Sequence, residues 1–212
     1  MMKKAMMKPM RATLAAAALA AACSSAPHLL EIDATYRYAG DDVVNGAAAL
    51  VPVELVQQLG GLPDPWPPGA PRLDLDVPVE AAAPLDLRTA SGGPLDLARA
   101  KTLRVLEVTA FADDDSLSPA PSTLELYVGP TGALHVADKG VVLVGRQGVP
   151  AAGQAGAFLL DVGGREALEA ALRAQTFELL FRVIVPWDTA AHPARPSGTA
   201  AFRARLTLES LP

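Results

Sequence analysis

The sequence has only one cysteine, Cys23, among its 212 residues. A single cysteine can form neither an intramolecular disulfide nor a cysteine-based metal cluster. Long apolar runs are also missing: none reaches the roughly 18 residues that a membrane-spanning helix needs, which excludes a polytopic membrane protein. Because 50% of the residues are hydrophobic and 19% are charged, the chain is too apolar to be wholly disordered. The length then fits one folded domain with at most a small appendage.

Reactive-site motifs are missing as well. The sequence contains no G-x-S-x-G, H-E-x-x-H or G-x-G-x-x-G pattern and no phosphate-binding glycine–lysine loop. The three histidines, His28, His135 and His192, stand far apart, so a zinc site would have to assemble from distant segments. We therefore predict that the protein is not an enzyme and needs no cofactor.

Basic charge is scarce over most of the chain. Residues 1–22 hold four basic and no acidic residues, so the rest of the chain carries a net charge of −9. Nucleic-acid binding depends on a basic stripe that neutralises phosphates, and an acidic chain lacks it. We predict no nucleic-acid partner, and attachment to an anionic membrane would need something other than charge.

The N-terminal segment has the composition of a secretory signal. Its four basic residues come before residue 12, and the run from Ala12 to Ala22 has Thr13 as its only polar residue. As a helix this run would be about 16 Å long, roughly half the thickness of the hydrocarbon core of a bilayer. A basic start, a short apolar stretch and small residues before a cleavage site are typical of a signal peptide that is removed.

The end of this segment, Leu19-Ala20-Ala21-Ala22-Cys23, resembles the lipobox of bacterial lipoproteins. In that class small residues lead directly into a cysteine whose thiol receives diacylglycerol. A dedicated peptidase cuts before the cysteine, and the new amine is usually acylated. The commonest pattern has leucine three residues before the cysteine, whereas here Ala20 has that place and Leu19 precedes it. The resemblance implies lipidation of Cys23 and covers about a tenth of the chain.

Ordinary signal peptidase cleavage after Ala22 is the alternative, because Ala20-Ala21-Ala22 also satisfies the small-x-small rule. That cleavage would release a secreted or periplasmic protein. In the lipoprotein class, a residue other than aspartate after the cysteine, here Ser24, usually implies export to the outer membrane. The resemblance thus implies a signal peptide over 1–22 and a lipidated tether over 23–28. We expect the remainder, 29–212, to be a single domain.

Period-two alternation of apolar and polar residues predicts strands along much of the remaining chain. It is clearest in residues 124–128, 177–185 and 202–208. Less regular segments complete the predicted set, which spans residues 29–36, 73–79, 102–112, 141–144 and 157–162. Pro78 favours an edge position for the strand that contains it, because proline cannot donate a ladder hydrogen bond.

Two segments have a different pattern. Residues 165–174 carry apolar residues at helical spacing after Gly163-Gly164, which predicts a short helix. Residues 52–59, followed by two glycines, favour a second helix over a poor strand. Residues 62–71 contain five prolines and predict a semi-rigid loop.

Together these elements predict a mainly β fold. Seven to nine short strands with one or two short helices favour an antiparallel β-sandwich. The pattern loosely resembles immunoglobulin-like sandwiches at the level of architecture, without their cysteine pair. The sequence Pro-Leu-Asp-Leu occurs at 84–87 and again at 94–97, which predicts a hairpin turning at 91–93.

Two tryptophans and three arginines are the candidate binding residues. Trp66 and Trp187 each adjoin proline in a predicted loop. An exposed ring there would favour protein or glycan contacts, and a buried ring would cap the core. Arg182, Arg203 and Arg205 point outward from two strands that we expect to pair through the 187–198 loop. They would then form a small basic patch, which the outward Glu178 and Glu209 of the same strands would neutralise.

Two acidic groups complete the candidates. Asp74 and Asp76 share one face of a strand, roughly 7 Å apart, a separation comparable to that of glycosidase acid pairs. Residues 113–115 are three adjacent aspartates that could supply oxygens to calcium, although the spacing of a dedicated calcium loop is missing. For both groups we predict solvated carboxylates.

The sequence therefore predicts a non-catalytic β-sandwich that a lipid anchor holds at the envelope. It would bind a protein, a glycan or another envelope polymer, or have a structural role. A glycan-directed hydrolase is one alternative, and it predicts a deep pocket where the carboxylates converge. A calcium-dependent adhesion module is the other, and it predicts stabilisation by calcium.

Overall fold

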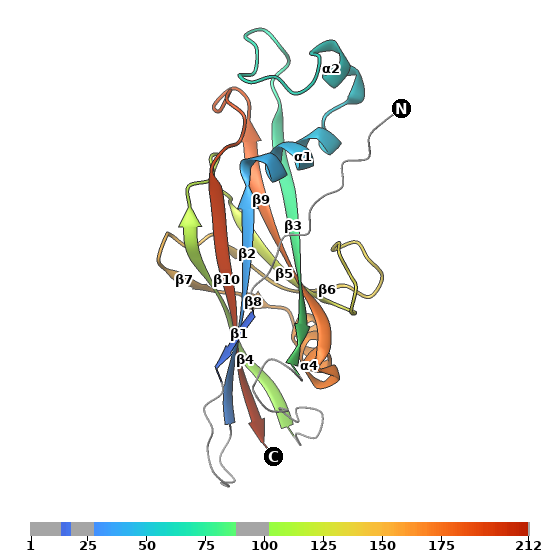
Figure 1. Cartoon of the computed structure of the whole chain (residues 1–212), viewed down its shortest axis with the longest axis vertical. Coiled ribbons are helices and arrows are strands. Elements are labelled where there is room, and N and C mark those ends of the chain that lie inside the picture. The colour runs from blue at the N-terminus through green and yellow to red at the C-terminus, as the bar shows by residue number, and fades with distance from the viewer. Residues whose placement is uncertain (1–13, 18–27, 88–101, 212) are drawn as a thin grey trace.

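Two antiparallel sheets of five strands each make up most of the described part of the protein (Figure 1). The computed structural model describes residues 14–17, 28–87 and 102–211. In order across the first sheet, the strands are β1 (Leu14–Ala17), β2 (His28–Ala39), β10 (Thr199–Leu211), β4 (Thr102–Asp115) and β7 (Ala155–Ala157). Across the second they are β3 (Asp74–Asp86), β9 (Thr176–Asp188), β5 (Thr123–Gly129), β6 (Val142–Gly148) and β8 (Leu159–Leu160). The predicted antiparallel β-sandwich is confirmed.

Alternating side chains of the long strands fill the space between the sheets. In β3 every second residue from Val77 to Leu85 is buried, and in β10 the same holds from Ala200 to Leu208. The centre of this core is an aromatic cluster around Phe181 of β9. Its ring stacks on Tyr36 at 4.8 Å between centroids and lies 6.0 Å from that of Phe202. Since Tyr36 and Phe202 belong to the first sheet, this cluster joins the two layers.

The described residues include the helices α1 (Gly40–Leu50), α2 (Val53–Gln58) and α4 (Val162–Ala174). The helices predicted at 52–59 and 165–174 correspond to α2 and α4. The first helix, α1, was not predicted, because only Gly40, Val43 and Ala47 of its residues are buried and so narrow a stripe gives little periodic signal. Helix α4 packs against β4 of one sheet and β5, β6 and β9 of the other, with Leu168 and Leu172 fully buried.

The expected pairing of the last two long strands is wrong. β9 lies between β3 and β5 in one sheet, whereas β10 lies between β2 and β4 in the other. Residues 189–198 connect them from one sheet to the other, and ten residues are ample to cross the about 10 Å that separates packed sheets. Two consecutive strands with good alternation can pair with each other or face each other across a core, and here they face each other.

Part of the predicted signal segment is extended and not helical. Leu14–Ala17 form β1, which pairs with Glu31–Ala34 of β2. Alanine and leucine favour a helix in isolation, so the extended form of this segment comes from its pairing with the hydrogen-bonding edge that β2 offers. The second copy of the Pro-Leu-Asp-Leu repeat and the turn at 91–93 lie outside the described residues.

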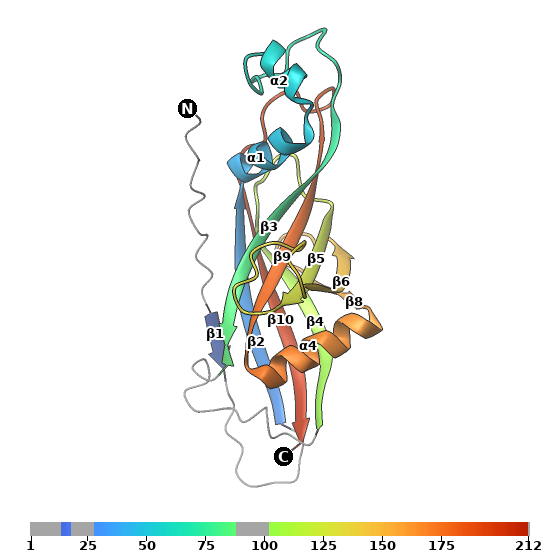
Figure 2. The ribbon, with the colours of Figure 1, turned by 90° about the vertical axis from the view of Figure 1, so that its right-hand side faces the viewer.

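The helices α1 and α2 and the end of the last strand lie at opposite ends of the long axis of the molecule. α1, α2 and the proline-rich loop gather at one end, and β10 finishes at the other (Figures 1 and 2). There Ser210 lies opposite His28, so β2 begins where β10 finishes. Among the described residues, no helix combines the length and the apolar character needed to cross a bilayer.

Candidate functional site

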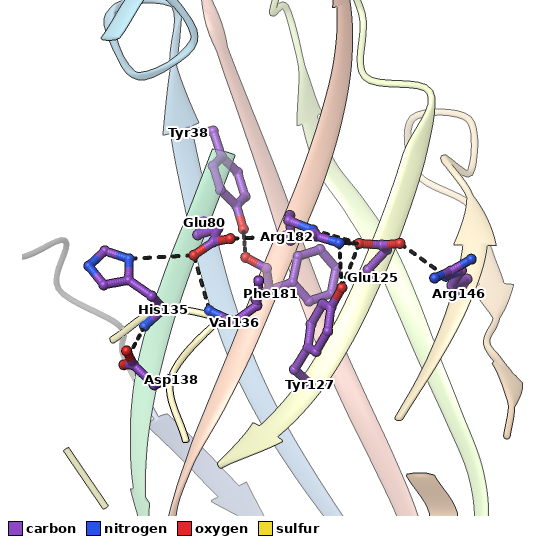
Figure 3. A network of polar contacts seen from close by, with 10 residues as sticks. All are labelled: Tyr38, Glu80, Glu125, Tyr127, His135, Val136, Asp138, Arg146, Phe181 and Arg182. Carbon is purple, nitrogen blue, oxygen red and sulfur yellow. Dashed lines mark hydrogen bonds and ion pairs between the residues drawn. The ribbon is translucent and has the colours of Figure 1, made fainter. Parts of the chain in front are cut away.

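The outer face of the second sheet carries a row of alternating charges, which we call the charge row: Glu80, Arg182, Glu125 and Arg146. They come from β3, β9, β5 and β6 in that order, and each lies directly opposite the next in the strand register. Directly opposed residues of opposite charge stabilise antiparallel strands. The row thus crosses four neighbouring strands in a straight line (Figure 3).

Glu125 is the centre of the charge row, and it is buried. One of its oxygens accepts from Arg182 Nε at 2.6 Å and the other pairs with Arg146 Nε at 3.0 Å. Tyr127 donates its hydroxyl to Glu125 at 2.8 Å, and the guanidinium of Arg182 lies 5.1 Å from the centre of the tyrosine ring. These contacts compensate the cost of removing a carboxylate from water.

The phenol of Tyr127 stays protonated in this setting. Burial, followed by its hydrogen bond to Glu125, raises the pKa of Tyr127 to about 12. A general base needs a pKa near the working pH. Tyr127 therefore acts as a fixed hydrogen-bond donor here and does not accept protons.

A loop folds over this face beside the charge row, and we call residues 130–141 the covering loop. Glu80 accepts from the amide of Val136 at 3.2 Å and pairs with His135 at 3.5 Å. Glu178 accepts from the amide of Gly132 at 3.0 Å. Ala133 of the loop packs with Tyr127 and Leu180 of the sheet in a second, smaller apolar cluster. Glu178 therefore holds this loop and is not a neutralising partner of the arginines on β10.

The covering loop is also stabilised by hydrogen bonds within it. Asp138 accepts hydrogen bonds from the amides of Leu134 and His135 at 2.8 and 3.0 Å. These two bonds lower the pKa of Asp138 below its ordinary value. Glu80, Glu125 and Asp138 each have several donors and Glu178 has one, so this polar cluster fixes a loop on a sheet. Sequence reasoning did not find it, because its members lie up to 102 positions apart and only the pairing of the strands aligns them.

The predicted basic patch is wrong. Arg182 belongs to the second sheet, whereas Arg203 and Arg205 lie on β10 in the first. The latter two flank the ring of Phe111, with guanidinium carbons 5.0 and 5.3 Å from its centre. Each is paired with a carboxylate, Arg203 with Asp113 at 3.2 Å and Arg205 with Asp33 at 2.8 Å. The carboxylates neutralise these arginines, and no anion-binding patch results.

Both tryptophans are part of the core. The side chain of Trp187 is fully buried, and Trp66 is 6% exposed. Each indole donates to a backbone carbonyl five residues further along the chain, Trp66 to Pro71 at 3.1 Å and Trp187 to His192 at 3.0 Å. Both rings therefore belong to the core, which is the second of the two outcomes expected from the sequence. The predicted loop position of Trp187 is wrong, because this residue lies near the end of β9.

A shallow hollow of about 330 Å³ lies beside Trp66 at this end of the molecule, lined mainly by Pro67, Pro68, Arg72, Thr189 and Pro193. Its walls are held together by contacts between the proline-rich loop and the connection that follows β9. Arg72 donates from Nε and Nη2 to the two carboxylate oxygens of Asp188, at 2.8 and 2.7 Å, which lowers the pKa of Asp188. The amide of Trp66 donates to the carbonyl of Pro193 at 2.6 Å. The proline-rich loop is thus a firmly held surface.

The two acidic groups do not converge. Asp74 and Asp76 begin β3 in the second sheet, and residues 113–115 end β4 in the first. Hydrogen bonds, first from the Thr199 hydroxyl and next from the Ser116 amide, lower the pKa of Asp114, whereas an acid catalyst needs a raised one. Within the described residues, no group of three or more histidine, cysteine, aspartate or glutamate side chains is placed to hold a metal ion.

A second hollow, of about 450 Å³, lies between α4 and the ends of β5 and β6. Its lining is almost entirely apolar and includes Val128, Val142, Ala167, Ala171 and Phe177. None of the described residues that line it is charged. A hollow with this lining can take an apolar group.

Comparison with known proteins does not assign this chain to a family. No family model matches it, and neither a curated protein nor a solved structure resembles it significantly.

Proposed function

We propose that this protein is a bacterial lipoprotein whose β-sandwich is a non-catalytic binding or structural domain at the cell envelope. The observation that carries the proposal is the position of Cys23. It is the only cysteine of the chain, and it follows Leu19-Ala20-Ala21-Ala22 after a basic start. A lipid anchor there gives that thiol a role, whereas an unpaired thiol is otherwise a liability in an oxidising compartment.

The fold is compatible with attachment at that point. β2 begins at His28, five residues after Cys23. Five residues span at most about 17 Å, so the sandwich would stay close to the membrane surface. Two or three acyl chains give stable anchoring, whereas one chain gives only marginal binding. Ser24 favours the outer membrane as the destination under the sorting rule of this class.

The described part of the chain offers interactions and no catalytic constellation. The carboxylates of the charge row are saturated by arginine, tyrosine and backbone amides, and the acidic groups at 74–76 and 113–115 lie in different sheets. These observations support a domain that binds or spaces envelope components.

The anchor is tested by feeding producing cells a clickable palmitate analogue. We expect the protein to be labelled, the Cys23→Ala variant to lose all label, and a matched Ser25→Ala variant to keep it. Mass spectrometry of the purified native protein should show an acylated N-terminal cysteine. A free thiol at the N-terminus, or a retained leader, would contradict the proposal.

A further inference from the structure

Among the described residues, three of the four outermost strands are themselves poor templates for pairing with other strands. β7 and β8 are only three and two residues long. β3 contains Pro78 and Pro84, which cannot donate ladder hydrogen bonds. Short edge strands and edge prolines are the usual means by which proteins avoid edge-to-edge association.

The fourth edge depends on the predicted signal segment. β2 has 12 residues with no proline, glycine or lysine. Its neighbour on the outer side is β1, which pairs with Glu31–Ala34. If residues 1–22 are removed, as the proposed function requires, β1 is lost and a long regular strand becomes an edge. An uncovered strand of this kind is a template for pairing.

We propose that in the processed protein β2 pairs with β2 of a second copy, antiparallel across a two-fold axis. This inference rests on the cleavage of the leader that the proposed function includes. The four strands β2, β10, β4 and β7 of each copy would then form one continuous sheet of eight strands.

The sequence of β2 selects one register for this pairing. In an antiparallel pair, opposed residues point to the same face, so the axis must pass through a residue. With the axis at Ala34, nearly the whole strand overlaps, and the inward row opposes only apolar and aromatic side chains. On the outward row Glu31 of each copy lies opposite Arg37 of the other, and Asp33 lies opposite Thr35.

The charges needed for that register are available. The side chain of Glu31 is 52% exposed, and its contact with Arg205 is 3.5 Å long. Arg37 is exposed, and no salt bridge in the described part of the chain involves it. Asp33 is already held by two hydrogen bonds from Arg205, so registers that need Asp33 as the partner of Arg37 are less favourable.

The pairing also fixes where the anchors lie. The two His28 residues would be separated by 12 residue steps along the strands, about 40 Å. Both lipidated cysteines can enter one membrane when the strands lie along its surface.

The test is the oligomeric state of a chain that begins at Ser24, which keeps all of β2 to β10 and the whole core. We expect a dimer in analytical ultracentrifugation between roughly 1 and 100 µM. Arg37→Glu places like charges opposite each other twice and should weaken the dimer at least about tenfold. Adding Glu31→Arg to that variant should restore it. Arg165→Glu, an equal charge change on the exposed start of α4, is the matched control and should leave the dimer intact.

A folded, monomeric chain would overturn the proposal, and so would a dimer that Arg37→Glu leaves unchanged or that Glu31→Arg does not restore. Circular dichroism shows that each variant is folded. The same variants of the native protein, crosslinked in membranes, give a second readout that does not depend on folding without the lipid. Because the chain from Ser24 carries no acyl group, its dimerisation is tested separately from lipidation of Cys23.

Discussion

Each of the three tyrosines of the chain is buried and has its hydroxyl in a hydrogen bond. Tyr36 and Tyr38 reach from β2 to the carbonyls of Leu179 and Phe181 on β9, at 3.0 and 2.7 Å. Burial raises the pKa of both well above the ordinary value of 10.0. These phenols are neutral donors that hold the two sheets together.

This arrangement predicts how the protein responds to alkali. A group whose pKa is raised in the folded state adds stability below its unfolded pKa and loses it as the pH rises toward the folded value. Stability should therefore fall from about pH 10 upward. We expect the tyrosinate absorbance near 295 nm to stay low in folded protein at pH 10 to 11, and to appear together with the loss of the circular dichroism signal. Normal titration of even one tyrosine in the folded protein would contradict the structure.

Arg182 of the charge row gives the second prediction at the scale of single residues. Its replacement by alanine leaves Glu80 and the buried Glu125 without their shared cation. Removing one partner of a buried ion pair is strongly destabilising, and we expect a loss of about 2–4 kcal/mol in urea unfolding.

Arg146→Ala is the matched control for this prediction. The side chain of Arg146 is 63% exposed, and exposed ion pairs contribute only about 0–1 kcal/mol. Equal losses in the two variants would show that the order of burial along the charge row is wrong.

At the scale of elements, the start of α4 shows how closely a helix is seated on the sheets. A Cβ added at Gly164 would lie 2.3 Å from the carbonyl oxygen of Leu143 and 2.6 Å from the Cα of Val144. A Cβ at the neighbouring Gly163 would meet only a carboxylate oxygen of Asp161 at 3.4 Å. Gly164 therefore permits contact between the backbones of the helix and β6, whereas Gly163 does not serve that purpose.

Gly164→Ala should therefore destabilise the protein by about 1–3 kcal/mol, the range typical of overpacking. Gly163→Ala should be neutral or stabilising by up to about 1 kcal/mol, because alanine favours helix. Thermal unfolding of the two variants distinguishes these effects. A larger loss at position 163 than at 164 would be inconsistent with this seating of α4.

The positions of the strands in the sequence were more predictable than which strands lie next to each other. Alternation located β4, β5, β9 and β10, because one face of each is buried in a single core. Helix α1 escaped prediction, since so few of its side chains are buried. The covering loop also escaped prediction, because its closure over the sheet depends on Glu80 and Glu178 from other strands.

At the scale of the whole molecule, the arrangement of strands decides which side chains meet. Arg182 and Arg203 look equivalent in the sequence, yet they lie on opposite outer faces of the sandwich because β9 and β10 belong to different sheets. The charge row could not be predicted for the same reason. Alternation assigns a residue to a face, but it does not say which strand is next to it.

The positions of β2 and β10 decide how the protein can be labelled. Since Ser210 lies opposite His28, a fluorophore attached after β10 would sit at the same end of the sandwich as the proposed attachment to the lipid. A fluorophore at Gly69, in the exposed loop near Trp66, would sit at the far end of the long strands. Energy transfer to a dye in the bilayer should therefore report tilting of the molecule relative to the membrane, because the far site would move much more than the site beside the anchor.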